Sequence, residues 1–400
     1  MSKLTALLVF NQYQQLGGEE IVVQNEAQNL RDHGHEVHVL SISNHEIVTR
    51  WDVLNVALNA PYSQRSRVML KGVLSKIKPD IMHVHNFFPL LTPSIFDASD
   101  SEGVPSILTL HNYRLLCAGA NLSRDGKICE ICVRASPYSA VKYRCYRQSS
   151  LASLAVARMI ARHRRAGTWQ NRVTRFIALS EFSKSKFIQG EFPPEKISVK
   201  GNFMKDPLPD SPEHTTAVPG GHSALYLGRL SSEKGVRTLI EAWRSMDIPL
   251  RVVGDGPQLL ALKEQAPPPP LVEFLGHCDR EKVEREIRRA SFLVVPSECY
   301  ETFSMATMEA YAHGKPVIAS RIGALQEIVT DGVTGLHFES GNSDNLVAKA
   351  KQICENPKVY SELCRGARNK YLSDFSPKVN YENLEQIYRQ AQMDFKRKTL

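Results

Sequence analysis

The sequence has no apolar run long enough to cross a lipid bilayer, which takes about 20 consecutive apolar residues. The longest run outside the strand-like segments, from Ser150 to Ala161, is shorter and contains Arg158. The apolar run near the N-terminus is also short, and no small-residue cleavage site follows it, so we interpret it as a strand and not as a signal peptide. We therefore expect a cytoplasmic protein.

Acidic residues are missing from one long stretch of the chain. None occurs between Glu130 and Glu181, whereas the whole chain has a formal net charge of +8. Such a block predicts an anionic partner, which could be a membrane surface, a nucleic acid or a phosphorylated substrate. A solvated basic face is the alternative. The basic residues of this stretch are Arg134, Lys142, Arg144, Arg147, Arg158, Arg162, Arg164, Arg165, Arg172 and Arg175.

A disulfide framework is not expected, because cysteines in a long cytoplasmic chain usually serve as thiols or as metal ligands. Four of the eight cysteines lie close together in the sequence: Cys117, Cys129, Cys132 and Cys145. Four thiolates that include one C-x2-C pair could hold a structural zinc ion in this insert. Buried free thiols are the alternative.

Two series of short apolar runs alternate with helical stretches, a pattern typical of parallel, doubly wound α/β sheets. The first series begins with Leu4 to Phe10 and ends with Arg175 to Ser180, and the second begins at Ala224. The segment between them, from about Ile197 to Ser223, is rich in Pro, Gly, Ser and Asp, as linkers are. The sequence therefore predicts two α/β domains.

Ligands of parallel sheets bind where the strands end, so the residues that follow the strands of the first domain are candidates. Gly17 and Gly18 stand directly before a helix, where backbone amides can receive a ligand, although a simple tight turn is the alternative. The sequence lacks G-x-G-x-x-G here, which argues against a dinucleotide. His111 follows another strand and could donate to a hydroxyl or a phosphate, although a single histidine is more often structural.

Two loops of the second domain also follow strands. The loop from Gly228 to Gly235 carries Arg229 and Lys234 and leads into a helix, so that two cations and free amides could bind a diphosphate. An ordinary surface loop is the alternative. In the loop Val252–Pro257 the glycines would admit a ligand, whereas Asp255 could cap the next helix.

Two glutamates are eight positions apart in "ETFSMATME". Glu301 follows a strand, and Glu309 falls on a helix between Ser304 and Gly314, where three of its four neighbours at helical spacing are apolar. A buried, unpaired carboxylate is costly, so we expect Glu309 to have a partner. That partner could be a protein donor or the hydroxyls of a sugar.

Together these segments resemble the retaining glycosyltransferases of family 4, which have the GT-B fold. Glu301 and Glu309 resemble the family's E-x7-E motif, and "LGGEE", "LHNYR" and "GRLSSEKG" resemble its Gly-rich loop, its strand-end histidine and its diphosphate loop. "VVGDGP" and "FLGH" resemble its base-binding edge. One departure is that Thr302-Phe303-Ser304 stands where the family usually has Gly-Phe-Gly, which bears on the identity of the donor sugar.

The resemblance implies two Rossmann-like domains facing a cleft. Residues 1–200, completed by a C-terminal helix at 377–400, would bind the acceptor, and residues 201–376 would bind a UDP- or GDP-sugar. The catalytic residues would be His111, Arg229, Lys234 and Glu301, with no catalytic metal ion, since the two cations neutralise the leaving diphosphate. The donor-binding residues would be Gly17, Gly18, Gly228, Arg229, Lys234, Gly254, Asp255, Gly256, His277, Glu301, Thr302, Phe303, Ser304, Met305 and Glu309.

The implied reaction is transfer of the sugar, with retention, to a lipid-linked glycan or polysaccharide in cell-surface glycan biosynthesis. The basic segment 134–175 would place the protein peripherally on the inner face of an anionic membrane. No nucleic acid is expected, because no aromatic-interleaved binding motif accompanies the charges. The alternatives are a nucleotide-sugar epimerase or phosphorylase of the same fold, and a non-enzymatic protein that binds membranes or nucleic acids.

Overall fold

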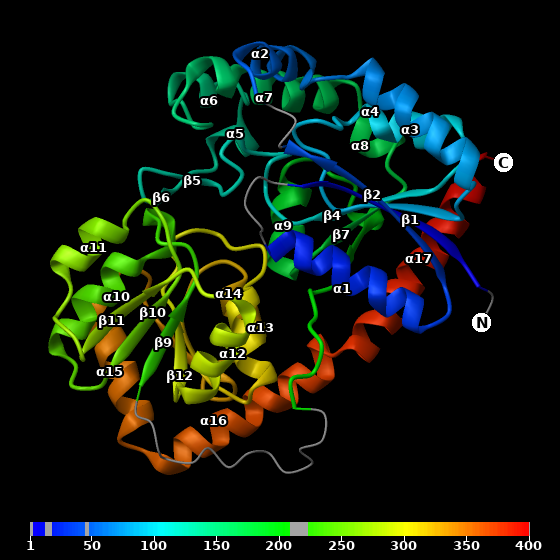
Figure 1. Ribbon diagram of the computed structural model, residues 1–400. Coiled ribbons are helices and arrows are strands. Elements are labelled where there is room, and N and C mark those ends of the chain that lie inside the picture. The colour runs from blue at the N-terminus through cyan, green and yellow to red at the C-terminus, as the bar shows by residue number, and fades with distance from the viewer. Residues whose placement is uncertain (1–2, 13–17, 45–47, 209–222, 400) are drawn as a thin grey trace. The chain divides into compact units, whose positions relative to one another are not determined.

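The structure, a computed structural model, describes residues 3–12, 18–44, 48–208 and 223–399. The contacts within the chain divide it into two compact units (Figure 1). One unit consists of Met1–Leu122, Cys129–Asn202 and Asn380–Leu400, and the other of Ser123–Ile128 and Phe203–Val379. Each unit is built on a six-stranded sheet. In the described part of the chain, no helix is both long enough and apolar enough to cross a membrane.

The sheet of the first unit is parallel throughout and has the strand order β2-β1-β3-β4-β7-β8. Its inner strands are apolar over nearly their whole length, as expected for strands that are buried on both faces. The last strand, β8, falls within the segment in which we expected no further pattern. The strands are β1 (Thr5–Gln12), β2 (Glu36–Ser43), β3 (Ile81–Val84), β4 (Ser106–Leu110), β7 (Arg175–Ala178) and β8 (Ile197–Val199).

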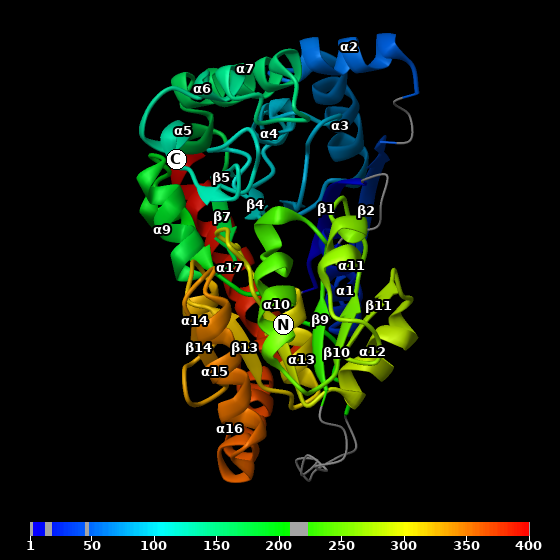
Figure 2. The same cartoon turned by 90° about the vertical axis from the view of Figure 1, so that its left-hand side faces the viewer.

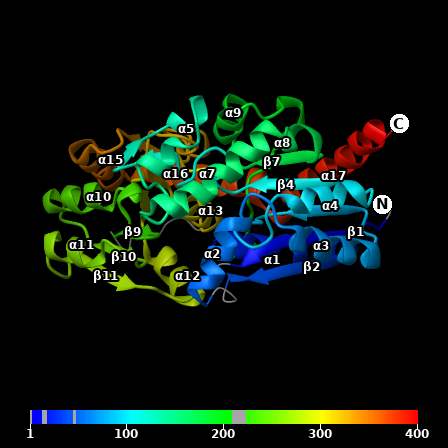
Figure 3. The ribbon, with the colours of Figure 1, turned by 90° about the horizontal axis from the view of Figure 1, so that it is seen from above.

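Helices cover this sheet, and three of them lie together at one end of the unit: α2, α6 and α7, with α7 in contact with the other two (Figure 2). A second pair, α3 and α4, packs side by side (Figure 3). The helices are α1 (Gly18–Asp32), α2 (Arg50–Asn59), α3 (Gln64–Ile77), α4 (Ser94–Ser101), α5 (Ile131–Arg134), α6 (Ser139–Lys142), α7 (Ser150–Arg165), α8 (Thr168–Asn171) and α9 (Glu181–Gln189). A short hairpin, β5 (Ser123–Arg124) and β6 (Lys127–Ile128), precedes α5.

The apolar face of α7 packs into the protein. Ala155, Met159 and Ile160 are buried, whereas Leu151 at the start of the helix is 79% exposed. This helix lies within the basic segment 134–175 that we expected to face a membrane, and most of its apolar side chains are not available to lipid, because they are used in the core. The arginines of its last turn, such as Arg165, remain on the surface.

The C-terminal helix α17 (Pro377–Thr399) contributes to the core of the first unit. Tyr381, Leu384 and Tyr388 are buried in the same apolar cluster as residues of β1 and α1. The ring of Tyr381 stacks on His33 with centroids 3.6 Å apart, and its hydroxyl bonds to His35. The last helix of the chain therefore packs beside the first strand (Figure 1).

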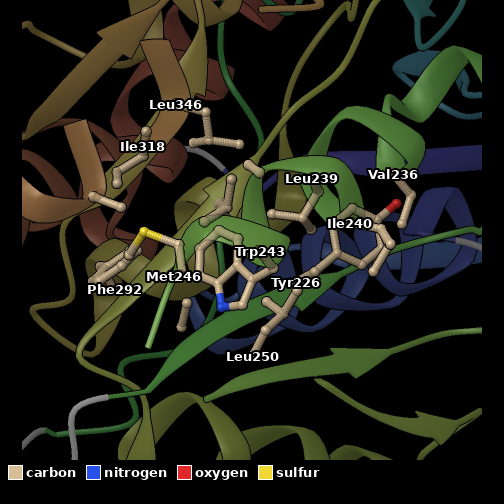
Figure 4. Close-up of a cluster of buried hydrophobic side chains, with 14 of the residues drawn as sticks. Tyr226, Val236, Leu239, Ile240, Trp243, Met246, Leu250, Phe292, Ile318 and Leu346 are labelled. Atoms are coloured by element: carbon tan, nitrogen blue, oxygen red, sulfur yellow. The ribbon is translucent and has the colours of Figure 1, made fainter. Parts of the chain in front are cut away.

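The sheet of the second unit is also parallel, with the order β11-β10-β9-β12-β13-β14. Trp243, which is fully buried, lies in the middle of its core (Figure 4). The strands are β9 (Ala224–Leu227), β10 (Leu250–Val253), β11 (Val272–Gly276), β12 (Phe292–Val295), β13 (Val317–Ser320) and β14 (Gly335–Phe338). The helices are α10 (Val236–Ala242), α11 (Leu259–Gln265), α12 (Arg280–Arg289), α13 (Met305–Ala312), α14 (Leu325–Ile328), α15 (Ser343–Cys354) and α16 (Pro357–Lys370).

The strand order of each sheet reverses direction at one point. In the second sheet the reversal lies between β9 and β12, and in the first sheet it lies between β1 and β3. Open α/β sheets bind ligands at such switch points, outside the carboxyl ends of the strands. The loops that follow these four strands are therefore the places to look for a site.

Candidate functional residues at the strand ends of each unit

Three loops of the second unit meet backbone to backbone at the carboxyl ends of β9, β10 and β12. A Cβ on Gly235, whose φ is +65°, would lie 1.9 Å from the carbonyl oxygen of Pro296, and one on Gly254 would lie 1.8 Å from that of Gly228. Gly256 is similarly tight against the carbonyl of Leu230. We expected Gly254 and Gly256 to admit a ligand, but the neighbour that they admit in this structure is the adjacent loop.

Lys234 and Glu301 face each other across the switch point between β9 and β12. Lys234 Nζ donates to Glu301 Oε1 at 2.7 Å, and the same oxygen accepts from Ser297 Oγ at 2.6 Å. Burial alone would lower the pKa of Lys234, but the carboxylate of Glu301 outweighs it and raises this pKa. Lys234 is therefore a firmly charged ammonium ion, and two of the predicted catalytic side chains are in direct contact.

Glu309 lies on α13, which Ser304 begins by accepting a hydrogen bond from the backbone amide of Thr307. The core-facing residues of this helix include Met308 and Tyr311, so Glu309 does not point into the core as we expected and is only half-buried. Its surroundings still remove enough water to raise the pKa of its carboxyl to about 7. Among the residues that the structure describes, none donates a hydrogen bond to its carboxylate.

The Thr302-Phe303-Ser304 segment has a structural explanation for two of its three residues. Ser304 supplies the N-cap of α13, which glycine would cap less well. Phe303 is buried, and its ring meets the ring of Phe375 edge to face with centroids 5.5 Å apart. Thr302 and Met305 are half-buried.

Three of the predicted donor-binding side chains are exposed. Arg229 follows β9 and makes no ion pair with any residue in the described ranges, and His277 follows β11. Asp255 accepts a hydrogen bond from the backbone amide of Gly256 at 2.7 Å and does not cap α11, which has no side-chain cap. These side chains are available to a ligand without breaking an internal ion pair.

In the first unit, His111 follows β4 and bonds to His85, with 3.0 Å between His111 Nε2 and His85 Nδ1. Burial, followed by the neighbouring His85, lowers the pKa of His111 to about 3, so its imidazole is neutral at ordinary pH. Gly18 is the first residue of α1, as expected, whereas Gly17 lies outside the described residues.

Glu19 is a polar residue at this edge that the sequence analysis did not select. The side-chain amides of Asn86 and Asn112 donate to its two carboxylate oxygens at 3.3 and 3.2 Å. Burial raises the pKa of Glu19 to about 7, although the two amides and Arg114 oppose the shift. Its position next to Gly18, at the start of a helix that follows a strand, is the signal that could have identified it.

A buried polar cluster lies next to His111, and the sequence analysis missed its carboxylate, Glu26, and its cation, Lys200. The cluster contains Glu26 of α1 and His83 of β3. It also contains His85, which directly follows β3, and Lys200, which directly follows β8. Glu26 lies three and four positions from Val23, Val22 and Leu30, which are buried on the same face of α1. That placement of a carboxylate among apolar residues, the pattern noted for Glu309, was the missed signal.

The donor atoms of Glu26, His83 and His85 lie within 4.8 Å of one another, and among the described residues no other set of this kind occurs. The ammonium group of Lys200 lies 2.6 Å from Glu26 Oε1 and supplies the positive charge that a metal ion would bring to this set. The four clustered cysteines are free thiols. Burial is the main cause that raises the pKa of Cys132 to about 12, and the other three thiols add to the shift because they lie nearby. They do not form a compact ligand set in this structure.

The first unit also has a hollow of about 670 Å³, which lies between β7, β8 and α17. Its principal cations already have partners, since Arg175 pairs with Asp394 and Lys196 donates to the carbonyls of Gln170 and Val173. The strand ends are therefore better candidates, since in the second unit the charged side chains of Lys234 and Glu301 meet there.

Comparison with known proteins concerns the family and the fold. Residues 16–204 match the family model described as Glycosyltransferase Family 4, and residues 212–370 match the model described as Glycosyl transferases group 1. An uncharacterized glycosyltransferase of Methanocaldococcus jannaschii is 34% identical over 160 residues, which are 40% of this chain and 44% of that protein. The matches to the first curated relatives thus span less than half of the length of each relative.

Two further similarities extend the comparison. The lipopolysaccharide 1,2-N-acetylglucosaminetransferase of Salmonella typhimurium is 26% identical over 239 residues, 54% of this chain and 61% of that protein. The crystal structure of HepE from Anabaena in complex with UDP-glucose superposes with a TM-score of 0.67 at 19% identity, over 96% of this chain and all of that one. At this identity the structural match establishes the fold alone. The GT-B fold that the sequence predicted is confirmed.

The two family models match successive parts of the chain, and together they account for most of it. The sheets that carry Lys234, Glu301 and His111 belong to the GT-B fold. The chain therefore belongs to the glycosyltransferases of family 4 and group 1, as its motifs predicted.

Proposed function

We propose that this protein is a retaining glycosyltransferase that uses no catalytic metal ion. It transfers a sugar from a nucleotide-sugar to a lipid-linked glycan or a polysaccharide, in the biosynthesis of a cell-surface glycan. The observation that carries the proposal is the contact of Lys234 with Glu301 at the switch point of the second sheet, because a cation and a carboxylate there suit a diphosphate and a sugar.

Each of the donor-site residues has a chemical task in this proposal. Glu309, once ionised, accepts hydrogen bonds from the ribose hydroxyls of the nucleotide, and Glu301 accepts from hydroxyls of the transferred sugar. An ammonium ion has three donors, so Lys234 can hold Glu301 and still donate to the diphosphate. Arg229, exposed beside it, adds a second positive charge.

The same cations favour the reaction itself. Negative charge grows on the diphosphate as the bond to the sugar breaks, and positive groups fixed nearby stabilise that transition state more than the ground state. Lys234 is fixed in this sense, because its ion pair holds it in place before the donor arrives. In the first unit, His111 would bind a hydroxyl group of a sugar substrate through its imidazole.

Two relatives support the class of donor and acceptor. HepE is seen with UDP-glucose, and the Salmonella protein is named for a transfer within lipopolysaccharide. The test is a panel of UDP-, GDP- and ADP-sugars, scored by thermal stabilisation of the protein and by slow hydrolysis of the sugar donor. At least one donor should raise the melting temperature and be hydrolysed.

The variants Lys234→Ala and Glu309→Ala should lower turnover with that donor, whereas Lys263→Ala, which removes an exposed lysine from α11, should not. Unchanged turnover in both site variants would remove the assignment. In the absence of an acceptor, a product other than those of simple donor hydrolysis would favour an epimerase or a phosphorylase.

For a lipid-linked acceptor, the proposal includes binding of the protein to an anionic membrane. The exposed apolar side chains of α2 support it, since Trp51 is 79% and Leu58 is 61% exposed, and α2 packs against α7, whose Leu151 is also exposed. Exposed arginines of the acid-free segment, such as Arg158 and Arg165, lie on the same helix α7. Apolar side chains next to basic ones suit a surface of anionic lipid.

Trp51 provides a direct measurement, because the other two tryptophans, Trp169 and Trp243, are buried. Vesicles of phosphatidylglycerol and phosphatidylcholine should shift its fluorescence to the blue and carry the protein in flotation, whereas pure phosphatidylcholine should do neither. Leu58→Ser should weaken the binding, and Leu260→Ser, which changes an exposed leucine of the second unit, should not. Binding that is insensitive to lipid charge would contradict the proposal.

The zinc ion predicted for Cys117, Cys129, Cys132 and Cys145 also remains a proposal. The four thiols are neighbours, and closing them to ligand distances would cross-link the insert that contains α5 and α6. Metal analysis of protein purified without chelators should find one zinc per chain, and the quadruple Cys→Ser variant should lose it. A metal-free protein of full stability would end the idea.

A further inference from the structure

A line of buried polar groups in the first unit leads from Lys200 to His111. Lys200 Nζ donates to Glu26 Oε1 at 2.6 Å, and the other oxygen, Oε2, lies 3.3 Å from His85 Nε2. His85 Nδ1 lies 3.0 Å from His111 Nε2. Glu26, His85 and Lys200 are almost fully buried, and all four residues belong to the same unit. The polar groups in this line thus determine where each proton can lie.

The positions of the protons follow from the chemistry of each group. A carboxylate can only accept. Glu26 Oε2 and His85 Nε2 lie 3.3 Å apart, and neither atom makes a hydrogen bond within the described part of the chain. The proton of His85 is therefore most favourable on Nε2, the nitrogen that faces the carboxylate. His85 Nδ1 then has a lone pair and accepts the proton of His111 Nε2. Since a neutral imidazole carries one N–H, His111 Nδ1 is an acceptor.

The charges support this arrangement. Burial would raise the pKa of Glu26, but Lys200 and the histidines outweigh it and hold that pKa well below its ordinary value. Burial lowers the pKa of His111 to about 3, so His111 stays neutral. His83 Nδ1 also lies 3.6 Å from Glu26 Oε2, but its two nitrogens bond to the hydroxyls of Tyr388 and Thr109, so His83 does not connect Glu26 to His111.

A buried ion pair such as Glu26–Lys200 contributes little net stability over apolar side chains of similar size, so stability alone does not explain it. A histidine at a functional site, by contrast, needs a defined tautomer, and a partner on its other nitrogen sets it. The line leads to His111, which directly follows β4 and is the histidine of the first unit that the sequence predicted as a site residue.

We propose that Glu26, held by Lys200, is a positioning residue that acts through His85 to fix His111 in the Nε2-protonated tautomer. His111 Nδ1 is thereby presented as an acceptor, suited to a hydroxyl group of the sugar substrate. Only this last clause rests on the proposed function, since the tautomer itself is a property of the free protein. A carboxylate that acts at one remove on a substrate-binding histidine is a role distinct from those of Glu301 and Glu309.

The tautomers can be read directly by long-range nitrogen–proton NMR on protein labelled with 15N-histidine, at pH 7.5. His111→Asn and His85→Asn assign the two rings. We expect both rings to be neutral and protonated on Nε2. A His111 ring that is protonated on Nδ1, or that is an imidazolium ion, overturns the proposal, whether or not any sugar donor is turned over.

Glu26→Gln provides a sharper test, because it should reverse the line. Lys200 needs an oxygen at its position, which turns the amide nitrogen of the substituted side chain toward His85. His85 Nε2 must then accept, His85 Nδ1 must donate, and His111 should change to the Nδ1-protonated tautomer. Turnover should fall by about 10- to 100-fold, the usual effect of removing such an outer partner, with a smaller change in KM.

Tyr388→Phe is the matched control, since it removes a buried hydroxyl that bonds to His83 and leaves the side chains of Lys200, Glu26, His85 and His111 in place. It should leave the His111 spectrum and turnover unchanged. If Glu26→Gln does not fold, the wild-type spectrum still decides the question. A folded Glu26→Gln protein in which His111 keeps its tautomer would contradict the role given to Glu26.

Discussion

Lys234 and Glu301, 67 positions apart in the sequence, form an ion pair with 2.7 Å between Nζ and Oε1. One follows β9 and the other follows β12, the two strands between which the order of the second sheet reverses. The cation expected to bind the diphosphate and the carboxylate expected to bind the sugar therefore satisfy each other before any donor is present. The site is organised in advance, as a site that stabilises a transition state should be.

The first prediction concerns this pair. Lys234→Met and Glu301→Gln should each lower kcat/KM, Lys234→Met by about 100-fold, the usual effect of losing one group that stabilises developing charge. Because the two residues have separate tasks, the double variant should not recover activity. In urea unfolding the pair should show a coupling free energy of at most about 1 kcal/mol, since Lys234 is partly open to solvent.

A double variant that is as active as the better single variant would mean that the pair is structural only. Arg229→Met provides a comparison, because it removes a neighbouring cation that has no ion pair within the described part of the chain. It should lower activity without any change in stability.

The second prediction concerns the pH dependence of nucleotide binding. Burial raises the pKa of Glu309 to about 7, so the protonated form predominates below pH 7 and the ionised form above it. The ionised form accepts from two ribose hydroxyls through two charged oxygens, and such bonds are stronger than those to a neutral carboxyl group. Affinity for the nucleoside diphosphate should therefore fall as pH decreases below 7, and binding at pH 7 should release a fraction of a proton.

Calorimetry in two buffers of different ionisation enthalpy measures that release. Glu309→Gln should bind more weakly at pH 8 and should lack the part of the pH dependence that comes from this carboxyl. The terminal phosphate of the nucleotide titrates in both proteins and cancels in the comparison. Identical pH profiles for the two proteins would contradict the assignment of Glu309.

The sequence identified the strand ends, because parallel strands buried on both faces are short apolar runs that stand out from their surroundings. It also identified Lys234 and Glu301, since each closely follows such a run. It did not predict their contact, which depends on the order β9-β12 within the sheet and not on their separation along the chain.

Two other features were beyond local patterns. From the sequence, Gly254 and Gly256 could equally contact a ligand or another loop. Only the folded backbone places Gly228 and Leu230 against them. Glu26 pairs with Lys200 across 174 positions, and no periodicity in α1 indicates that partner. The buried position of Glu26, however, follows from its apolar neighbours at helical spacing.

The third prediction tests the contact between the loops after β9 and β12. Gly235 and Gly332 both have positive φ, +65° and +73°, but a Cβ on Gly235 would collide with the Pro296 carbonyl, whereas one on Gly332 would meet nothing within 4 Å. Gly332→Ala should thus cost only the backbone term, about 1–2 kcal/mol. Gly235→Ala should cost about 1–3 kcal/mol more, because a backbone loop must move.

The collision would also displace the loop that carries Lys234, so Gly235→Ala should lose donor hydrolysis even where the protein stays folded. Equal losses of unfolding free energy in the two variants would mean that the loops are not in contact. Thermal unfolding and donor hydrolysis measured on the same preparations separate the two effects.

The fourth prediction concerns the stability of the first unit in mild acid. Burial lowers the pKa of His83 and of His163, which bond to hydroxyls and, for His163, to the carbonyl of Pro61. Below pH 6.5 the unfolded chain binds protons at these residues that the folded chain does not bind, so stability should fall as pH decreases through 6.5. Each such histidine contributes about 1.4 kcal/mol per pH unit once the pH is below its unfolded value.

Glu19 opposes this trend, because its raised pKa of about 7 lets the folded state bind a proton between pH 7 and pH 4.5 that the unfolded state does not bind. The histidines outnumber it, since burial also lowers the pKa values of His35 and His111 in the same unit. Unfolding in urea at pH 7.5, 6.5 and 5.5 should therefore show a net loss of stability. His163→Gln should flatten the dependence by up to one proton. A dependence that is equally steep in the wild type and in this variant would mean that His163 binds its proton as readily in the folded state as in the unfolded one.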